Sequence, residues 1–175
     1  MQVPLVLTVI GADRPGLVEK VARLVAEHGG NWLESRMCRL GGQFAGIVRV
    51  FTTTDQRAAL TQALTALASQ GLKVEVYADV PTARANDAQW AVVELVGQDR
   101  PGIVRQVAAA LAARGVNVED LRTECVSAPM SGETLFKAEA RLQLPAGCDL
   151  SALRQDLEKI AADLLVDITF EPVKP

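Results

Sequence analysis

An internal repeat constrains the fold of this chain more than any other feature. The segment at residues 11–18 returns 86 positions later, and the two versions read Gly11-Ala12-Asp13-Arg14-Pro15-Gly16-Leu17-Val18 and Gly97-Gln98-Asp99-Arg100-Pro101-Gly102-Ile103-Val104. The same offset pairs identical residues further along: Val21 with Val107, Ala22 with Ala108, Gly29 with Gly115, Asn31 with Asn117 and Arg36 with Arg122. Self-similarity at a fixed offset indicates two copies of one structural unit.

Hydrophobic periodicity in the first copy predicts the order strand, helix, strand, strand, helix, strand. Asp13 and Pro15 are typical of a helix start, and Gly29-Gly30 is typical of a helix end. We expect Asp55 to cap the second helix and Gly41-Gly42 to form a hairpin turn. The strands are expected at residues 3–10, 31–40, 43–53 and 72–78.

The second copy repeats this order. Its strands are expected at 90–96, 117–126, 135–144 and 166–170, and its helices at 101–114 and near 151–164. Each copy is therefore expected to be an α+β module of the ferredoxin-like βαββαβ type, with both helices on one face of the sheet. We expect module boundaries at 1–80 and 89–175, joined by a linker at 81–88. The uncovered sheet faces predict pairing with another module and a homo-oligomer.

Composition argues against nucleic-acid and membrane functions. The net charge is −3, and Lys and Arg do not cluster, so we expect no direct nucleic-acid binding. The few aromatic residues lack the spacing of an RNA-stacking sheet. No apolar stretch approaches the ~20 residues of a membrane helix, and residues 1–5 lack a basic signal-peptide region. The sequence thus predicts a cytoplasmic protein with no membrane partner.

Groups for catalysis or metal binding are scarce. His28 is the only histidine, and its place at a helix end favours a structural role. Cys38, Cys125 and Cys148 form no Cys-x-x-Cys pair and are expected to be buried thiols. The chain also lacks a phosphate-binding loop of the Walker type. We therefore expect no enzyme, no catalytic residue, no metal and no cofactor.

The repeated turn is the one feature with binding chemistry. A helix start presents main-chain N–H groups that suit a carboxylate. Gly16 and Gly102 would let a ligand approach closely, and Asn31 and Asn117 offer both donors and acceptors. The turn could equally be a purely structural strand-to-helix connection. The two arginines it contains could be solvated or could pair with a carboxylate across an interface.

The turn G-x-D-R-P-G-[LI]-V, with Gly-x-Asn before the next strand, resembles the ACT domain in both halves of the chain. That resemblance implies a regulatory module that binds small molecules, usually amino acids, where two modules pair. The ligand-binding residues it implies are Asp13, Arg14, Gly16, Leu17 and Asn31 in the first copy, and Asp99, Arg100, Gly102, Ile103 and Asn117 in the second.

The tandem arrangement narrows the resemblance. Two ACT modules, with a longer hairpin at 128–132 followed by Leu135-Phe136, are similar to the glycine cleavage system transcriptional repressor family. This implies a protein that responds to glycine or a related amino acid and binds a partner transcription factor rather than DNA. The alternative is an ACT-type regulatory subunit that controls a metabolic enzyme in trans. The copies differ at Ala12 and Gln98, at Gly30 and Val116, and at Trp32 and Val118, so we expect two unequal sites.

Overall fold

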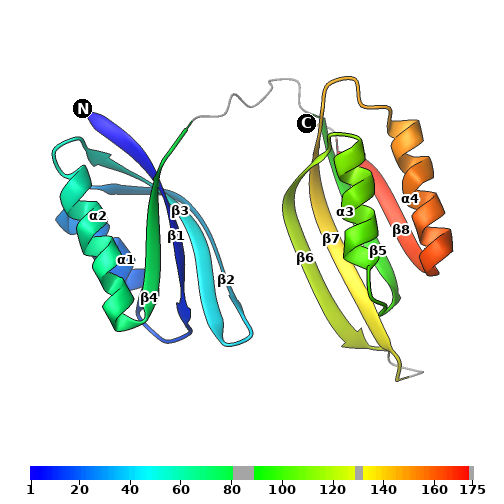
Figure 1. The fold of residues 1–175 in the computed structure, drawn as a ribbon, viewed down its shortest axis with the longest axis horizontal. Coiled ribbons are helices and arrows are strands. Elements are labelled where there is room, and N and C mark those ends of the chain that lie inside the picture. The colour runs from blue at the N-terminus through cyan, green and yellow to red at the C-terminus, as the bar shows by residue number, and fades with distance from the viewer. Residues whose placement is uncertain (81–88, 129–131, 174–175) are drawn as a thin grey trace. The chain divides into compact units, whose positions relative to one another are not determined.

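The computed structural model describes residues 1–80, 89–128 and 132–173. The chain divides into two compact units, here called module 1 (residues 1–80) and module 2 (residues 89–173), and each is described by itself (Figure 1). The expected linker at 81–88, and residues 129–131 of the expected long hairpin, lie outside the described residues.

Module 1 has the expected order of elements. Its strands form one antiparallel sheet in the order β2-β3-β1-β4, and its helices pack on one face of that sheet (Figure 1). The elements are β1 (Gln2–Ala12), α1 (Leu17–Glu27), β2 (Asn31–Leu40), β3 (Gln43–Thr53), α2 (Arg57–Ala66), the 3-10 helix η1 (Leu67–Gln70) and β4 (Leu72–Ala78).

Module 2 repeats this topology, with an antiparallel sheet in the order β6-β7-β5-β8. Its elements are β5 (Gln89–Gln98), α3 (Ile103–Ala113), β6 (Asn117–Ser127), β7 (Thr134–Leu144), α4 (Leu150–Leu164) and β8 (Val166–Val173). The predicted fold class, two ferredoxin-like α+β modules in tandem, is confirmed. Within the described parts of the chain, no helix is long and apolar enough to cross a lipid bilayer.

Alternation along the strands directs one apolar row of each sheet toward the helices. In module 1, Leu5 and Leu7 of β1 are fully buried and belong to the same core as Val21 of α1 and Leu64 of α2. Burying one such leucine stabilises the fold by roughly 1.5–3 kcal/mol. The apolar stripes of α1 and α2 are therefore held against the sheet, and this fixes where the preceding turns lie.

The first helix of each module begins later than the sequence indicates. α1 begins at Leu17, not at Asp13 to Pro15, and its N-cap Gly16 has φ 88° and ψ 4°. In α3 the N-cap Gly102 has φ 96° and ψ 0°. These angles are those of the third residue of a type II turn, in which proline is common at the second position. The Pro-Gly pair thus forms a turn before the helix rather than its first turn.

Helix capping also differs from the prediction at the second helices. The expected cap by Asp55 is wrong, because the N-cap of α2 is Gln56 and no side chain caps that helix. In α4 the N-cap is Asp149, whose carboxylate accepts a hydrogen bond of 3.0 Å from the main-chain N–H of Ala152. An aspartate three residues before a free N–H is a readable cap signal, and Asp149 was not among the predicted caps.

Candidate ligand site

The turn of module 1 is held by contacts on two sides. The Asp13 N–H donates to the Gly42 carbonyl at 2.9 Å, and the Asp13 carboxylate pairs with Arg39 Nε at 2.6 Å. The Arg14 guanidinium donates to the main-chain carbonyl of Gln70 at the end of η1. The side chains of Asp13 and Arg14 therefore position the turn between the β2–β3 hairpin and η1.

The turn of module 2 is anchored differently. The Asp99 N–H donates to the Thr134 carbonyl at 3.0 Å, which matches the contact of Asp13 with the other hairpin. Arg100, however, donates to Oε1 of Gln98 at 3.0 Å, and module 1 has Ala12 at the position of Gln98. Arg100 is thus paired with its own strand end, and the two turns offer different surroundings to a ligand.

The helix starts present main-chain donors rather than side chains. Leu17 and Ile103 are each only 3% exposed, so their side chains belong to the cores. The first hydrogen bonds that lead into the helices run from the N–H of Lys20 to Gly16 and from the N–H of Gln106 to Gly102. The N–H groups of residues 17–19 and 103–105 come before these first bonds, so they have no carbonyl partner within the helix. Such groups attract anions through their partial positive charge.

Gly16 and Gly102 are required by conformation and not by crowding. An added Cβ at either residue would meet no other described atom within 4 Å, whereas both have φ values in the left-handed region. No other segment of the same module lies beside either glycine, and the expected approach of a ligand there stays a prediction. Their role in the protein is to form the type II turn.

Asn31 and Asn117 lie far from the turn of their own module. Asn31 pairs with Phe51, and Phe51 pairs with Pro4, near the start of β1, whereas Asp13 follows the end of β1. Eight residues of extended strand between Pro4 and Ala12 span about 26 Å. In module 2, Asn117 is level with Trp90 in the same way. One module therefore does not bring its turn and its asparagine together.

The residues considered for catalysis have structural surroundings. His28 is half-buried at the end of α1, with Nδ1 2.8 Å from the Leu24 carbonyl, as expected for a structural histidine. The expected burial of the thiols is wrong for Cys38 and Cys125, which are exposed on the edge strands β2 and β6, while Cys148 is half-buried. The described residues contain no group of three or more His, Cys, Asp or Glu that could hold a metal ion.

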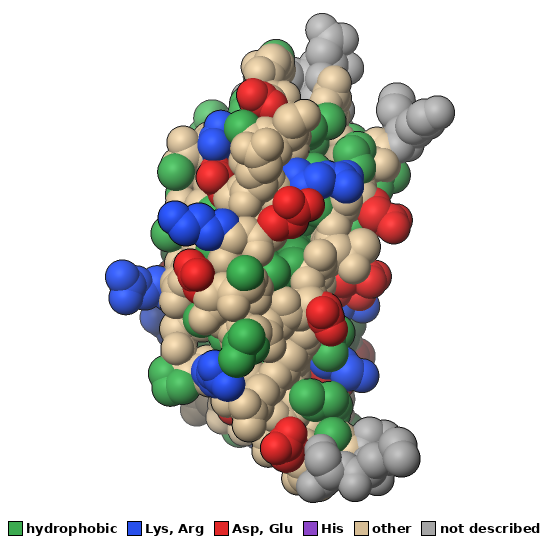
Figure 2. Space-filling model, turned by 90° about the vertical axis from the view of Figure 1, so that its right-hand side faces the viewer, with side chains coloured by type: hydrophobic (Ala, Val, Ile, Leu, Met, Phe, Trp, Pro, Cys, Tyr) green, Lys and Arg blue, Asp and Glu red, His purple; other side chains and the backbone are tan. Residues whose placement is uncertain are grey.

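The open sheet faces of the two modules differ in chemistry. In module 1, Ile10, Ile47 and Tyr77 are 48%, 56% and 49% exposed. At the centre of this face Thr8 pairs with Ile47, whereas the corresponding pair in module 2 is Glu94 with Glu139. Figure 2 shows acidic and basic side chains mixed over one face of the molecule, without a large area of one sign. The open face of module 1 is the more apolar of the two.

A polar trio lies along β4 at the border of the open face of module 1. Lys73 Nζ is 2.7 Å from the Glu75 carboxylate, and the Tyr77 hydroxyl donates to the same carboxylate. The hydrogen bond from Lys73 lowers the pKa of Glu75, and the Tyr77 hydroxyl acts in the same direction. The hydrogen bond to Glu75 raises the pKa of Tyr77. Glu75 therefore stays ionised and holds both neighbours at the rim of the apolar surface.

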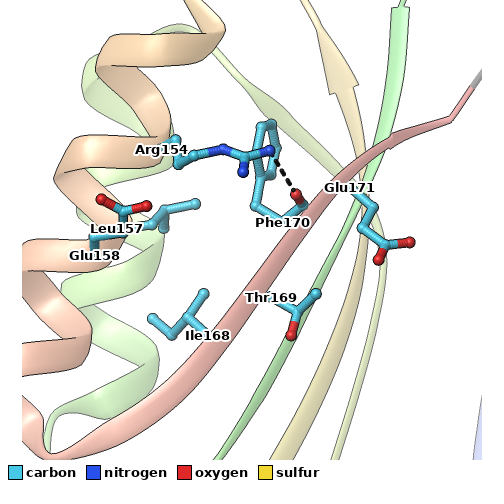
Figure 3. A pocket seen from close by; sticks show the side chains of 7 residues that line it. All are labelled: Arg154, Leu157, Glu158, Ile168, Thr169, Phe170 and Glu171. Atoms are coloured by element: carbon cyan, nitrogen blue, oxygen red, sulfur yellow. Dashed lines mark hydrogen bonds between the residues drawn. The ribbon is translucent and has the colours of Figure 1, made fainter.

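A groove of about 340 Å³ lies between α4 and β8, away from every residue that the sequence singled out (Figure 3). Arg154 crosses it, donates to the Phe170 carbonyl at 3.2 Å and lies 5.8 Å from the centre of the Phe170 ring. These contacts already engage the one cation of the groove, and Glu158, Thr169 and Glu171 complete its polar lining. The groove resembles an ordinary helix–strand boundary more than a binding site.

Comparisons with known proteins agree with the fold. Models of the ACT domain match residues 3–77 and residues 91–136. The chain is 26% identical over 168 residues to the glycine cleavage system transcriptional repressor of Escherichia coli, which covers 91% of this chain and 85% of that protein. It is 27% identical over 176 residues to the phosphoserine phosphatase SerB2 of Mycobacterium tuberculosis, covering 97% of this chain but 41% of that protein. A solved structure of an unknown protein from Galdieria sulphuraria superposes with a TM-score of 0.85 at 30% identity, over 99% of this chain and all of that one.

Proposed function

The chain belongs to the ACT-domain family, and from that premise we propose that it is an amino-acid-responsive regulator that controls transcription indirectly, through a partner transcription factor. The observation that carries the proposal is the similarity to the E. coli repressor, which extends over both modules and 91% of the chain. The activity is regulatory and not catalytic, and we place it in the cytoplasm.

The ligand we propose is glycine or a related amino acid. Its carboxylate suits the N–H groups at the starts of α1 and α3, next to the turns at 13–16 and 99–102. Asn31 or Asn117 would supply a side-chain carbonyl for the ammonium group. Since one module keeps its turn and its asparagine about 26 Å apart, a site that uses both needs a second ACT module. We propose that a second copy of the chain supplies it, so that the working unit is a homo-oligomer.

The partner we propose is a protein. The exposed apolar residues on the open face of module 1 favour a protein contact, because contiguous apolar surface of this kind marks interaction sites. The charged open face of module 2 and the net charge of −3 do not favour contact with DNA phosphates.

A second function has one observation in its favour. The match to the phosphoserine phosphatase spans 97% of this chain but 41% of that enzyme. The same pair of modules can therefore accompany an enzyme, which supports a regulatory subunit that controls a metabolic enzyme in trans.

Ligand binding is tested by thermal unfolding of the full chain with added glycine. A ligand at 100 times its Kd stabilises the native state by about 2.7 kcal/mol, a shift of several degrees. Asn31→Ala and Asn117→Ala should reduce the response, while Gln62→Ala on the exposed side of α2 should not. An unchanged response in both asparagine variants would remove these residues from the site.

The partner is tested by capture from a lysate with and without glycine, followed by mass spectrometry. A transcription factor whose recovery depends on glycine supports the first function. A metabolic enzyme with the same dependence supports the second. Recovery of neither, in the presence of a clear glycine response, contradicts both partner assignments.

A further inference from the structure

The open face of module 1 is the side of the sheet away from α1 and α2 (Figure 1). Its centre is formed by the residues that alternate with the core residues along β1 and β3, namely Val6, Thr8, Ile10, Ala45 and Ile47. Ile10 and Ile47 are about half exposed in one module. Exposed apolar side chains that lie together on a flat surface mark a contact site.

The two borders of this face carry opposite charges in the same row. Thr8 and Ile47 pair at the centre of the face. Thr8 also pairs with Glu75 of β4, and Ile47 also pairs with Arg36 of β2. Three strand spacings separate the backbones of Glu75 and Arg36 by about 14 Å. The row therefore runs from an acid at one edge of the sheet, across an apolar centre, to a base at the other edge.

A second copy of the chain fits this row by symmetry. Sheets packed face to face keep their strands within about 30° of each other, and a homodimer uses a two-fold axis that joins the same patch of both copies. An axis along the strands, between β1 and β3, places Glu75 of each copy over Arg36 of the other. An axis across the strands, through the same row, would place Glu75 over Glu75. The charges therefore select the axis along the strands.

The neighbouring rows fit the same axis. The facing pairs that it creates there are Lys73 with Cys38, Ile10 with Ala45, Tyr77 with Glu34, and Val6 with Arg49. The charge of Arg49 is balanced within its own copy by Asp79, whose carboxylate lies 2.6 Å from Arg49 Nε. No facing pair in these rows joins two like charges.

The open face of module 2 has the opposite property. The equivalent axis, between β5 and β7, places β8 of one copy over β6 of the other. The facing pairs then include Glu94 with Glu139, Asp167 with Glu124, and Glu171 with Asp120. Each of these pairs brings two carboxylates together, and like charges across an interface oppose association. The charge pattern thus permits self-association on module 1 and opposes it on module 2.

The size of the face sets the strength of the contact. Four strands make the face about 19 Å wide, and the strand from Pro4 to Ala12 makes it about 26 Å long. Two copies would therefore bury roughly 1,000 Å² between them, which is the lower limit for a specific interface. A contact of this size is expected to form a concentration-dependent dimer rather than a permanent one.

We propose that the chain dimerises through the open face of module 1, with the strands of the two copies aligned and Glu75 of each copy facing Arg36 of the other. A second copy is then the protein contact that the exposed apolar residues of this face favour. The inference goes beyond the proposed function and holds whichever ligand or transcription factor the chain binds. A transcription factor would have to bind elsewhere on the chain.

The test is sedimentation velocity of the full chain over a range of concentrations, with two single variants. Glu75→Arg gives a chain with a base at both borders of the face, and Arg36→Glu gives a chain with an acid at both borders. Each variant alone brings like charges together, so its association should weaken by about tenfold or more. An equimolar mixture of the two variants should associate again, because every facing pair then has opposite charges.

The matched controls are Glu94→Arg and Arg122→Glu, which make the same exchanges on the open face of module 2. Neither control should weaken association, and mixing them should have no effect. Ile47→Asp places a charge at the apolar centre and should prevent association alone and in every mixture. Circular dichroism shows whether each variant is folded, and the exposed positions of Glu75 and Arg36 favour folding.

The outcomes separate this inference from the proposed function. A wild-type chain that stays monomeric up to millimolar concentration overturns the dimer. Association that persists unchanged in both single variants, or that their mixture does not restore, overturns the facing of Glu75 and Arg36. Association lost in each variant and regained on mixing supports the proposal. The thermal response to glycine is a separate readout, and its absence would contradict the proposed ligand without affecting this dimer.

Discussion

Replacing Gly16 with alanine tests whether conformation alone requires this glycine. Gly16 has φ 88°, and an added Cβ would meet no other described atom within 4 Å. Placing an L-residue in the left-handed region costs roughly 1–2 kcal/mol. The lower entropy of the unfolded chain with alanine offsets about 0.4–1 kcal/mol of this cost. We therefore expect Gly16→Ala to destabilise module 1 by about 1 kcal/mol, or about 4–8 °C for a module of this size.

The measurement is urea unfolding followed by tryptophan fluorescence. Each module carries one tryptophan, Trp32 in module 1 and Trp90 in module 2, so Trp90→Phe makes the signal specific to module 1. Gly16→Asn should recover part of the loss, because asparagine tolerates the left-handed region better than alanine. Equal losses for alanine and asparagine, or no loss with alanine, would refute the conformational argument.

Gly11 provides the steric contrast. It has no positive φ, but an added Cβ would lie 2.5 Å from the main-chain oxygen of Gly71. Gly11→Ala should therefore destabilise module 1 by more than Gly16→Ala, and asparagine should be worse still, since its side chain is larger.

Three further predictions concern local interactions. Asp149→Ala should lower the stability of module 2 by about 1 kcal/mol, because α4 loses its cap. Asp55→Ala should change the stability of module 1 by less than ~0.5 kcal/mol. The midpoints of urea unfolding measure both effects. Trp32→Val should uncover the part of the module 1 core that the indole packs against, and should destabilise the module by about 1–3 kcal/mol. A circular dichroism melt unchanged by this variant would contradict the role of the indole. The raised pKa of Tyr77 should appear in an ultraviolet titration as phenolate formation above the ordinary pH range, and Glu75→Gln should bring it back toward the ordinary value.

Local sequence patterns mispredicted the helix starts where a helix start and a β-turn favour the same residues. Asp-x-Pro-Gly fits both a helix start and a β-turn, because proline is favoured at the first position of a helix and at the second position of a turn. The positive φ of Gly16 decides for the turn. Asp55 fits the cap rule as well as Asp149 does, but α2 has Gln56 as its N-cap and no side-chain cap, whereas Asp149 has an extended backbone and accepts a hydrogen bond from the Ala152 N–H.

Sequence patterns also failed to predict how far apart the residues of the candidate site lie. The sequence places Asp13 and Asn31 eighteen positions apart, and a resemblance joins them in one site. The strand register puts them at opposite ends of the sheet, because α1 returns the chain to the level at which β1 began. Their distance therefore depends on topology, and a shared site depends on assembly.

By itself the sequence determined the two-module architecture, since an 86-residue repeat with matched periodicities leaves room for one fold used twice. It also determined that the copies are unequal, because Trp32 and Val118 can be compared directly by register. Only the tertiary structure decided what that difference does. A tryptophan on an edge strand can point to solvent or to the core, and the packing of α1 on the sheet directs it inward. The smaller residues that module 2 carries opposite α3 include Val118 on β6 and Ala140 on β7, and they come to lie beside one another only once these two strands are paired.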